Sequence, residues 1–348
     1  MTNLIQTQRH LEKYIETIIH DSSLAIDTEF KRVDTYYPEL CLVQIATTHS
    51  VECIDVLSID NLEPLFEKLY NKKTLWIVHS ARQDIEALFK LSKRTPNALF
   101  DTQIAASLLN YPVQISYQAL TEELQGVRLK KDHTRFDWTI RPLPKSVLDY
   151  ALDDVRYLIP NYRKLLNELK LNNKIQWQEE DSGYLLDPIL YDLSTEQIWY
   201  KTKGISRLSK KHQEEAMKLV AWREKNAKEK NIPRKWLMAD DKLIDYACGK
   251  NKLSEKSQKR FDEFIINSKN NFIIKDLAEI NKPLNASEKN TRKELQRNIK
   301  KIAKRYNLAP EVIITSKSLT KFIRGDSNLS FCRGWRAEIF NKEKLNAK

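Results

Sequence analysis

Four acidic side chains and one tyrosine, supplied by three segments far apart in the chain, have the types and the spacing to bind divalent metal ions. Asp27 and Glu29 lie two residues apart in the apolar segment SLAIDTEF, which predicts a buried strand with both carboxylates on one face. Asp84 follows a second apolar run, TLWIVH, and lies at the start of a helical pattern. Tyr150 and Asp154 are four residues apart, so a helix would place them one turn apart on one face.

Carboxylates gathered at one site repel one another, and their pKa values rise unless cations neutralise them. Mg²⁺ and Mn²⁺ suit such a site because they prefer oxygen ligands. Two such ions about 4 Å apart can activate an attacking water and stabilise the leaving oxygen of a phosphodiester. Each segment alone is also typical of an exposed acidic strand end or helix face, and a histidine such as His79 is more often structural than a ligand. The prediction of metal-assisted hydrolysis therefore rests on the ordered set.

The order of the three segments resembles the exonuclease motifs of the DEDDy group in the DnaQ-like superfamily, and of ribonuclease D in particular. The matching motifs are DTEF, H-x₄-D from His79 to Asp84, and Y-x₃-D from Tyr150 to Asp154. Further matches lie between them at TYYPELCLVQIA, FDTQIAASLL and DWTIRPL. The resemblance covers roughly the first half of the chain. It implies an α/β ribonuclease-H-like exonuclease domain, with a mixed sheet flanked by helices.

The resemblance also implies a role for each motif residue. Two divalent ions, Mg²⁺ or Mn²⁺, would be held by Asp27, Glu29, Asp84 and Asp154, with Asp27 bridging both ions. Tyr150 would position the nucleophilic water by a hydrogen bond, and removal of a proton by its phenol, whose ordinary pKa is about 10, stays open as a second role. Three residues in or near the first two motifs are expected at the substrate site: the 3′-terminal nucleotide would pack against Phe30 and the backbone of Thr28, and His79 would orient Asp84 or lie near a phosphate.

The elements that must position these residues follow from the apolar patterning. Three apolar runs, at residues 23–30, 40–48 and 51–57, are joined by short turn-like segments and predict an antiparallel meander. Alternating helical and strand patterns follow, which suits βαβ units. A long apolar periodicity over residues 146–170 predicts the helix that carries the third motif, with Pro160 kinking or breaking it.

Charge is divided unevenly along the chain, whose net charge is +12. Residues 1–200 contain 22 Lys and Arg against 29 Asp and Glu, whereas residues 201–348 contain 37 against 18. The corresponding net charges are −7 and +19. This asymmetry predicts an acidic half that requires metal ions and a basic half that contacts a phosphate backbone.

The basic half contains a segment, residues 207–247, that resembles the HRDC domain found in RecQ helicases and in ribonuclease D. The matching points are the helix around Trp222, the turn IPRKWLMADD and the helix after it. We interpret Trp222 and Trp236 as core residues. All-α HRDC-type domains are therefore expected to follow the α/β domain. The expected divisions are an exonuclease domain at 1–178, a linker at 179–204, an HRDC domain at 205–283 and a second, divergent HRDC-like domain at 284–348.

Six basic residues near the C-terminus are candidates for contact with a nucleic-acid backbone, although a solvated helix face explains them equally well. They are Lys293, Arg297, Lys300, Lys301, Lys304 and Arg305.

Cysteine usage and the N-terminus bear on the compartment. The four cysteines are widely spaced without a CxxC pair, which argues against a zinc site or a disulfide framework and suits a reducing compartment. The N-terminal segment carries charges throughout, and no apolar stretch approaches about 18 residues. We expect a cytoplasmic protein with no membrane association and no obligate protein partner.

The resemblance implies a 3′-to-5′ exoribonuclease that releases 5′-mononucleotides, with RNA, and tRNA precursors in particular, as its partner. A 3′–5′ DNA exonuclease of the same superfamily is one alternative, because HRDC domains occur in both settings and the sequence does not locate contacts to the 2′-OH. The other alternative is a catalytically silent nucleic-acid-binding protein. The presence of all four motif carboxylates weighs against that alternative.

Overall fold

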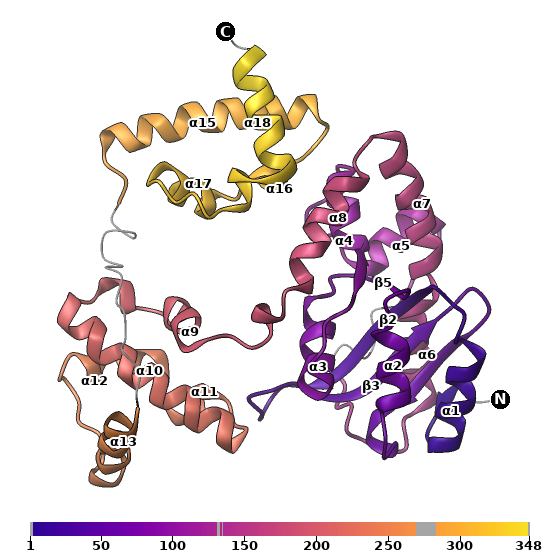
Figure 1. Cartoon of the computed structure of the whole chain (residues 1–348), viewed down its shortest axis with the longest axis horizontal. Helices are drawn as coiled ribbons and strands as arrows, with labels where there is room; N and C mark the ends of the chain where they lie inside the picture. The colour runs from indigo at the N-terminus through magenta and orange to yellow at the C-terminus, as the bar shows by residue number, and fades with distance from the viewer. Residues whose placement is uncertain (1–2, 131–132, 134, 269–282, 347–348) are drawn as a thin grey trace. The chain divides into compact units, whose positions relative to one another are not determined.

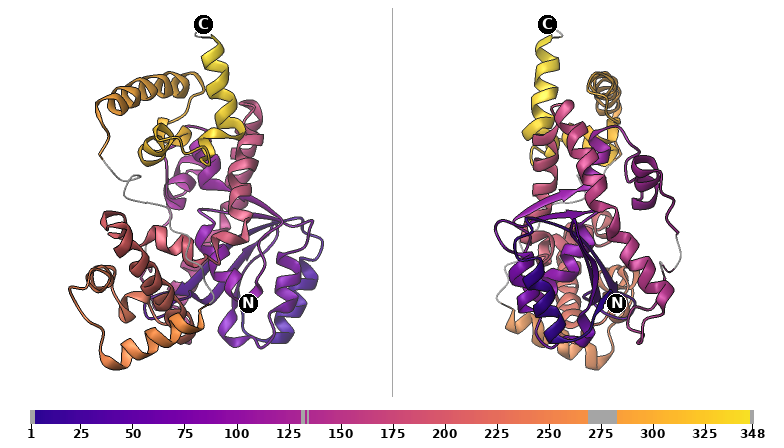
Figure 2. Two further views of the ribbon diagram at one scale, coloured as in Figure 1. Left: turned by 60° about the vertical axis from the view of Figure 1, so that its left-hand side comes forward. Right: turned by 90° about the vertical axis from the view of Figure 1, so that its right-hand side faces the viewer.

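The computed structural model describes residues 3–130, 133, 135–268 and 283–346 (Figure 1). The chain forms two compact units. Unit 1 comprises residues 1–31, 38–188 and 289–348, and unit 2 comprises residues 32–37 and 189–288. The first unit holds the sheet and the second is built from helices (Figure 2).

The sheet of unit 1 has six strands in the order β1-β4-β3-β2-β5-β6. β2, β3 and β4 pair antiparallel, whereas β5 and β6 extend the sheet in parallel beside β2, and β1 pairs parallel with β4. This confirms the predicted mixed sheet and its antiparallel meander. The strands are β1 (Leu4–Ile5), β2 (Ser23–Lys31), β3 (Glu39–Ala46), β4 (Val51–Asp55), β5 (Leu75–Val78) and β6 (Ala98–Asp101).

Helices flank this sheet and connect its parallel strands. Of these, α6 packs on β2, β3 and β4, and α3 packs on β2 and β3. Residues 146–170 form two helices, because Pro160 has no N–H to donate and lies in the first turn of the second helix, where that loss is tolerated. The helices are α1 (Gln8–Thr17), α2 (Glu63–Leu69), α3 (Arg82–Ser92), α4 (Thr102–Leu108), α5 (Tyr117–Gln125), α6 (Lys145–Arg156), α7 (Leu158–Leu171) and α8 (Ile175–Gly183), with short 3-10 helices at Val56–Ser58 and Tyr184–Leu186.

The C-terminal segment belongs to unit 1 rather than standing apart. Its elements are α15 (Ala286–Arg305), α16 (Pro310–Ile313), α17 (Ser316–Ile323), a 3-10 helix at Ser330–Cys332 and α18 (Gly334–Asn346). Ile299 and Ile302 of α15 share one apolar cluster with Leu108 of α4 and Leu165 of α7. The sequence division placed residues 284–348 in a domain of their own, because the pattern of a helix shows its apolar face but not the partner that covers it.

Polar contacts fasten the same segment. The indole rings of Trp177 and Trp335 stack with centroids 4.4 Å apart, and Arg336 Nη2 donates to Asp181 Oδ2 at 2.9 Å. Lys174 is buried, and its Nζ donates to the carbonyl oxygens of Leu108 at 2.7 Å and Tyr306 at 2.8 Å. Burial lowers the pKa of Lys174 to about 8, so at neutral pH a charged ammonium ties α4 to the residues that follow α15.

Unit 2 is a small helical bundle. Its helices are α9 (Thr195–Lys201), α10 (Lys210–Lys230), α11 (Arg234–Leu237), α12 (Asp240–Ala247) and α13 (Glu255–Asn267), with 3-10 helices at Pro188–Leu190, at its boundary with unit 1, and at Ile205–Arg207. The predicted linker, residues 179–204, thus contains the end of α8, two 3-10 helices and α9. The end of the predicted HRDC domain, residues 269–282, lies outside the described residues.

The bundle packs around Trp199, Leu219, Leu243 and Phe261, and the partly buried Trp222 lies against Phe261. The interpretation of Trp236 as a core residue is wrong, because 58% of this residue is exposed. Among the residues that the structure describes, every helix is too short or too polar to cross a bilayer.

Candidate active site

β2 provides the first two carboxylates. Asp27 and Glu29 lie on one face of this strand, opposite Gln44 and Leu42 of β3. The pairing of β2 with β5 ends at Ala25, so the residues beyond it continue past the carboxyl end of β5. Open α/β sheets bind ligands at such strand ends. A register shift between Glu29 and Phe30 then changes the pairing of β2 with β3.

α3 provides the third carboxylate, in its first turn. Asp84 is 6% exposed, and its Oδ1 accepts hydrogen bonds from the Thr28 backbone N–H at 3.1 Å and the Thr28 hydroxyl at 2.7 Å. The N-terminal end of a helix also favours negative charge. The resemblance implied that the backbone of Thr28 lies near substrate; the hydroxyl of this residue fixes Asp84 against β2.

The turn before α3 is held by a residue that the sequence analysis did not assign. Asp101, at the end of β6, accepts hydrogen bonds from the backbone N–H groups of Ser80 at 3.1 Å and Ala81 at 2.8 Å. Ser80 has a φ of 64°, in the left-handed region. Asp101 lies in the matched segment FDTQIAASLL. It is far in sequence from the turn before α3, so local pattern gave no sign that Asp101 holds the turn that leads to Asp84.

α6 provides the fourth carboxylate and the tyrosine. The phenol of Tyr150 hydrogen-bonds to the carboxylate of Asp154 one turn later. One carboxylate oxygen from each of Asp27, Glu29 and Asp154 lies within 4.8 Å of the other two. Within the described part of the chain, no other His, Cys, Asp or Glu side chains form a group of three this close.

The carboxylates strongly perturb one another. Burial and the charges of Asp154 and Asp84 raise the pKa of Glu29 to about 9. Burial raises the pKa of Asp84 to about 7 despite the hydrogen bonds from Thr28, and it raises the pKa of Asp154 to about 7 despite the hydrogen bond from Tyr150. The pKa of Asp27 is raised well above its ordinary value by burial and by the other carboxylates. Full ionisation near neutral pH therefore requires cations, and an all-oxygen donor set fits hard divalent ions.

Tyr150 is a hydrogen-bond donor rather than a base at this site. Burial and the neighbouring charges of Asp154 and Glu29 raise its pKa above the ordinary value of about 10. The phenol therefore stays protonated at neutral pH. It can orient an acceptor, such as the oxygen of a water, but cannot remove a proton from it.

The raised pKa values of the carboxylates predict that the stability of the metal-free fold falls as the pH rises, whereas the stabilisation by bound metal grows. Without metal, the carboxylates stabilise the fold below their unfolded pKa of about 4, and that contribution is lost as the pH rises through about 7, the folded pKa of Asp84 and Asp154. Mg²⁺ requires ionised ligands, so it should raise the melting temperature more at pH 8 than at pH 6. Scanning calorimetry with EDTA or excess Mg²⁺ measures this, and an equal increase at both pH values would contradict the assignment.

The carboxylates line a pocket of about 320 Å³, which Thr28, Phe30 and His79 also line. Both ring nitrogens of His79 have protein partners: Nδ1 contacts Thr102 Oγ1 and Nε2 donates to the Ile115 carbonyl, each at 2.9 Å. Burial lowers the pKa of His79, so the ring is neutral at pH 7. These contacts favour a structural role for His79 in the pocket wall.

The sequence analysis predicted only some of the residues that support α6. Tyr117 Oη donates to the Asp153 carbonyl at 2.9 Å and accepts from the Tyr157 N–H at 3.1 Å, which holds the end of α6. The pattern of α5 gave no sign of this role. Gln83, Tyr117 and Leu158 also line the pocket without having been predicted.

The matched segment DWTIRPL supports the start of α6. Arg141 makes two hydrogen bonds to the buried Asp55, from Nε at 2.7 Å and from Nη2 at 2.6 Å, and its Nη1 donates to the Trp138 carbonyl at 2.8 Å. The centroids of the Trp138 and Tyr150 rings are 6.4 Å apart. The segment thus links the end of β4 to the helix that carries the third motif.

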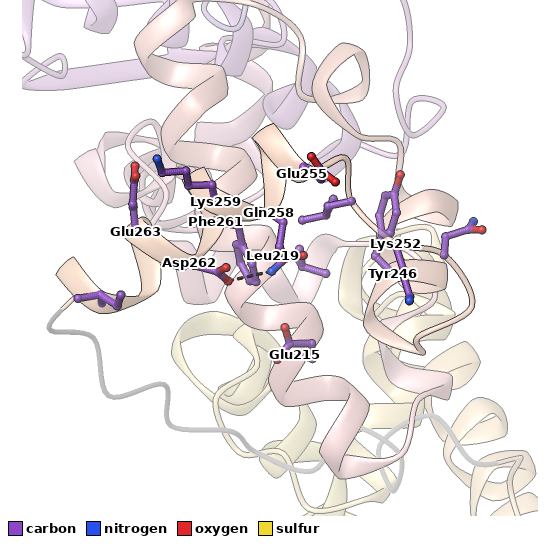
Figure 3. A pocket seen from close by; sticks show the side chains of 13 residues that line it. Glu215, Leu219, Tyr246, Lys252, Glu255, Gln258, Lys259, Phe261, Asp262 and Glu263 are labelled. Atoms are coloured by element: carbon purple, nitrogen blue, oxygen red, sulfur yellow. Dashed lines mark hydrogen bonds between the residues drawn. The ribbon is translucent and has the colours of Figure 1, made fainter.

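A second pocket, of about 630 Å³, lies in unit 2 (Figure 3). Acidic side chains outnumber basic ones in its lining, which also includes the buried residues Leu219 and Phe261. It therefore lacks both the grouped carboxylates of a metal site and the positive charge of a phosphate site. Its charged residues are Glu215, Lys252, Glu255, Lys259, Asp262 and Glu263.

The six basic candidates are not among the residues that line the carboxylate pocket. They lie exposed on α15, whose opposite face is buried through Ile299, Ile302 and Ala303. The six are Lys293, Arg297, Lys300, Lys301, Lys304 and Arg305.

Comparisons with known proteins identify the family of this chain. Residues 2–170 match a family model described as a 3′-5′ exonuclease. The chain is 35% identical to ribonuclease D of Bartonella henselae over 99% of this chain and 89% of that protein, and 34% identical to ribonuclease D of Nitrobacter hamburgensis over 99% and 95%. The crystal structure of Escherichia coli RNase D shares the fold, with a TM-score of 0.84 and 22% identity over 99% of this chain and 97% of that one. The chain belongs to the ribonuclease D family of 3′–5′ exoribonucleases.

Proposed function

We propose that this chain hydrolyses RNA from the 3′ end by a two-metal-ion mechanism. The observation that carries the proposal is the convergence of Asp27, Glu29 and Asp154 within 4.8 Å, with Asp84 held beside them by Thr28. Asp27, Glu29 and Asp154 would hold one ion, and Asp27 and Asp84 the other. Divalent ions at such a site supply positive charge and Lewis acidity to the reacting phosphodiester.

The remaining residues orient the reactants. In the metal-bound state the protonated phenol of Tyr150, which bonds to Asp154 in the metal-free site, would turn its O–H to the attacking water and hold that water beside Asp154. Phe30 and Thr28 line the pocket where the last nucleotide would lie, and an aromatic ring is suited to stack on a base. Attack at the last phosphodiester releases a 5′-mononucleotide and leaves a new 3′-OH.

The substrate class follows from the family and from the charge of the chain. Escherichia coli RNase D is described as an exoribonuclease involved in structured RNA processing. We propose that this chain likewise trims structured RNA ends, tRNA precursors among them. Mg²⁺ and Mn²⁺ are both suited to its oxygen ligands. The four cysteines are free, which suits a reducing compartment such as the cytoplasm.

The helical regions are proposed to hold the RNA. We assign residues 205–283 to an HRDC-type domain and residues 284–348 to a divergent HRDC-like segment. In the latter, Lys293, Arg297, Lys300 and Lys304 recur along one exposed side of α15. The exposed Trp236 on α11 is available for stacking on an unpaired base.

Neutralising part of the α15 side should weaken RNA binding through charge alone. Lys300→Ala/Lys304→Ala is expected to lower RNA affinity and to reduce the slope of log K against log salt by about one for each phosphate that the variant no longer contacts. Lys72→Ala/Lys73→Ala, which removes the same charge from the exposed turn before β5, is the matched control. Fluorescence anisotropy at several salt concentrations measures both. Equal slopes for the two double variants would show that α15 is not part of the RNA-binding surface.

The reaction itself is tested with a 5′-labelled RNA that carries a free 3′-OH, beside the matching DNA strand. Stepwise shortening of the RNA in Mg²⁺ or Mn²⁺ with release of 5′-mononucleotides is the expected result. Equal degradation of the DNA would assign the chain to DNA exonucleases. Metal-dependent cleavage of neither strand would make it a binding protein.

A further inference from the structure

Gln44 is a buried polar residue that is not among those lining the carboxylate pocket. It lies in the middle of β3 with 0% exposure, and neither its Nε2 nor its Oε1 has a hydrogen-bond partner in the described structure. A buried polar group without a partner is destabilising, and an apolar side chain of similar volume would avoid that cost. The amide therefore requires an explanation beyond packing.

The position of Gln44 points to the carboxylate site. It is directly opposite Asp27 in the antiparallel register of β2 and β3, so both side chains leave the sheet on the same face. Residues paired in this way have Cβ atoms about 5 Å apart, within reach of a glutamine side chain. On its other side Gln44 pairs with Cys53 of β4, which clusters with Ala151 and Leu152 of α6. The amide is thus enclosed between the sheet and the helix that carries Tyr150 and Asp154.

The chemistry of Asp27, Gln44 and Cys53, which lie side by side on β2, β3 and β4, determines which hydrogen bond can form. An ionised carboxylate only accepts hydrogen bonds, whereas the amide nitrogen of a glutamine donates two. Asp27 is partly buried, and the loss of solvent raises its pKa, so its charged form needs donors as well as cations. The thiol of Cys53 is a weak donor that could satisfy the amide oxygen from the opposite side.

We infer that Gln44 is a positioning residue for Asp27: when divalent ions hold Asp27 ionised, the Gln44 Nε2–H donates to a carboxylate oxygen of Asp27 and fixes its orientation. The inference rests on the proposed two-metal function. It assigns to Gln44 the part that outer hydrogen-bond partners play around many metal ligands, where their removal typically weakens metal binding 10- to 100-fold.

Gln44→Met tests this, because methionine preserves the length of the side chain and removes both polar atoms. The dissociation constant for Mn²⁺, measured by calorimetry on the full chain, is expected to rise at least about tenfold. The melting temperature in EDTA should stay the same or rise, since the unpartnered amide is gone. A residue that only packs would give the reverse: a lower melting temperature in EDTA and unchanged Mn²⁺ affinity.

Gln178→Met is the matched control. Gln178 is also buried in unit 1, but its Nε2 donates to Ser182 Oγ at 2.7 Å and it does not line the carboxylate pocket. This variant should lower the melting temperature in EDTA and leave the Mn²⁺ dissociation constant within about twofold of wild type. An equal effect of both variants on Mn²⁺ affinity would overturn the inference.

Two further outcomes separate this inference from the proposed function. Failure of the wild-type protein to bind Mn²⁺ would contradict the two-metal site itself, whereas normal binding by both wild type and Gln44→Met would contradict only the role of Gln44. If Gln44→Met does not fold, a structure of the Mg²⁺-loaded wild type decides. Nε2 within about 3.2 Å of an Asp27 oxygen is expected, and a separation beyond about 3.5 Å would overturn the inference.

Discussion

Asp27→Asn is expected to lower the single-turnover rate of RNA hydrolysis by at least about 10³-fold, equivalent to roughly 4 kcal/mol of transition-state stabilisation. Asparagine keeps the shape of the side chain but removes the charge that would hold both ions. RNA affinity should change little, because backbone contacts are expected from the basic helices. Rapid-quench kinetics and anisotropy measure the two quantities separately.

The same substitution should stabilise the metal-free protein. The carboxylates of Asp27, Glu29 and Asp154 repel one another in a partly buried site, and replacing one by an amide removes part of that repulsion. The melting temperature in EDTA is therefore expected to rise while activity disappears. A site built for function at the expense of stability behaves in this way.

Asp153→Asn provides the control for Asp27→Asn. Asp153 neighbours Asp154 on α6, but its half-exposed carboxylate pairs with Arg156 and does not line the pocket. Its substitution should leave the hydrolysis rate within a few-fold of wild type. Wild-type activity in Asp27→Asn, or equal losses in both variants, would contradict the assignment of Asp27.

Asp55→Asn is expected to lower the free energy of unfolding by about 3–5 kcal/mol, the largest effect on stability that we predict for a single substitution. The Asp55 side chain is 0% exposed and accepts two hydrogen bonds from Arg141, whose side chain is 21% exposed. Asparagine would leave the guanidinium charge without its partner beside β4. Urea unfolding followed by circular dichroism measures the change.

An exposed ion pair serves as the control for this prediction. Arg94 and Glu63 are 2.7 Å apart, but their side chains are 46% and 47% exposed. Glu63→Gln should therefore cost at most about 1 kcal/mol. A similar decrease in stability for Glu63→Gln and Asp55→Asn would show that burial does not determine the strength of the Asp55–Arg141 contact.

The pH dependence of Asp55 has the opposite sign to that of the metal-binding carboxylates. Burial by itself would raise its pKa, but hydrogen bonds from Arg141, Gln6 and Ser58 outweigh burial and lower it. The contribution of Asp55 is therefore present above the unfolded pKa of about 4 and is lost as the pH falls through the lower, folded pKa. The difference in unfolding free energy between wild type and Asp55→Asn should shrink as the solution is acidified.

The sequence predicted those parts of the fold that local pattern determines. Apolar runs located β2, β3 and β4, and Pro160 indicated the break between α6 and α7. The motif spacing selected the carboxylates that the structure brings to one pocket. The strands and the helix break depend on residues close together in sequence, the range over which strand and helix periodicity acts, whereas the gathering of the three motifs was expected from their resemblance to a known family.

Features that depend on contacts between distant segments were not predicted. The Thr28 hydroxyl bonds to Asp84 across 56 positions, and Arg141 reaches Asp55 across 86. Trp236 is exposed although tryptophan usually favours the core, and α15 covers apolar residues of α4 and α7 that its own pattern does not identify. Gln44 was passed over because a glutamine within an apolar run has no local signature.

The most direct test of the two-metal site is diffraction at the manganese absorption edge from crystals of the protein with Mn²⁺ and a short RNA that ends in a 3′-OH. Two anomalous peaks about 4 Å apart are expected, one bound by Asp27, Glu29 and Asp154 and the other between Asp27 and Asp84, with the terminal nucleotide beside Phe30. A single peak, or peaks away from these four carboxylates, would contradict the two-metal mechanism.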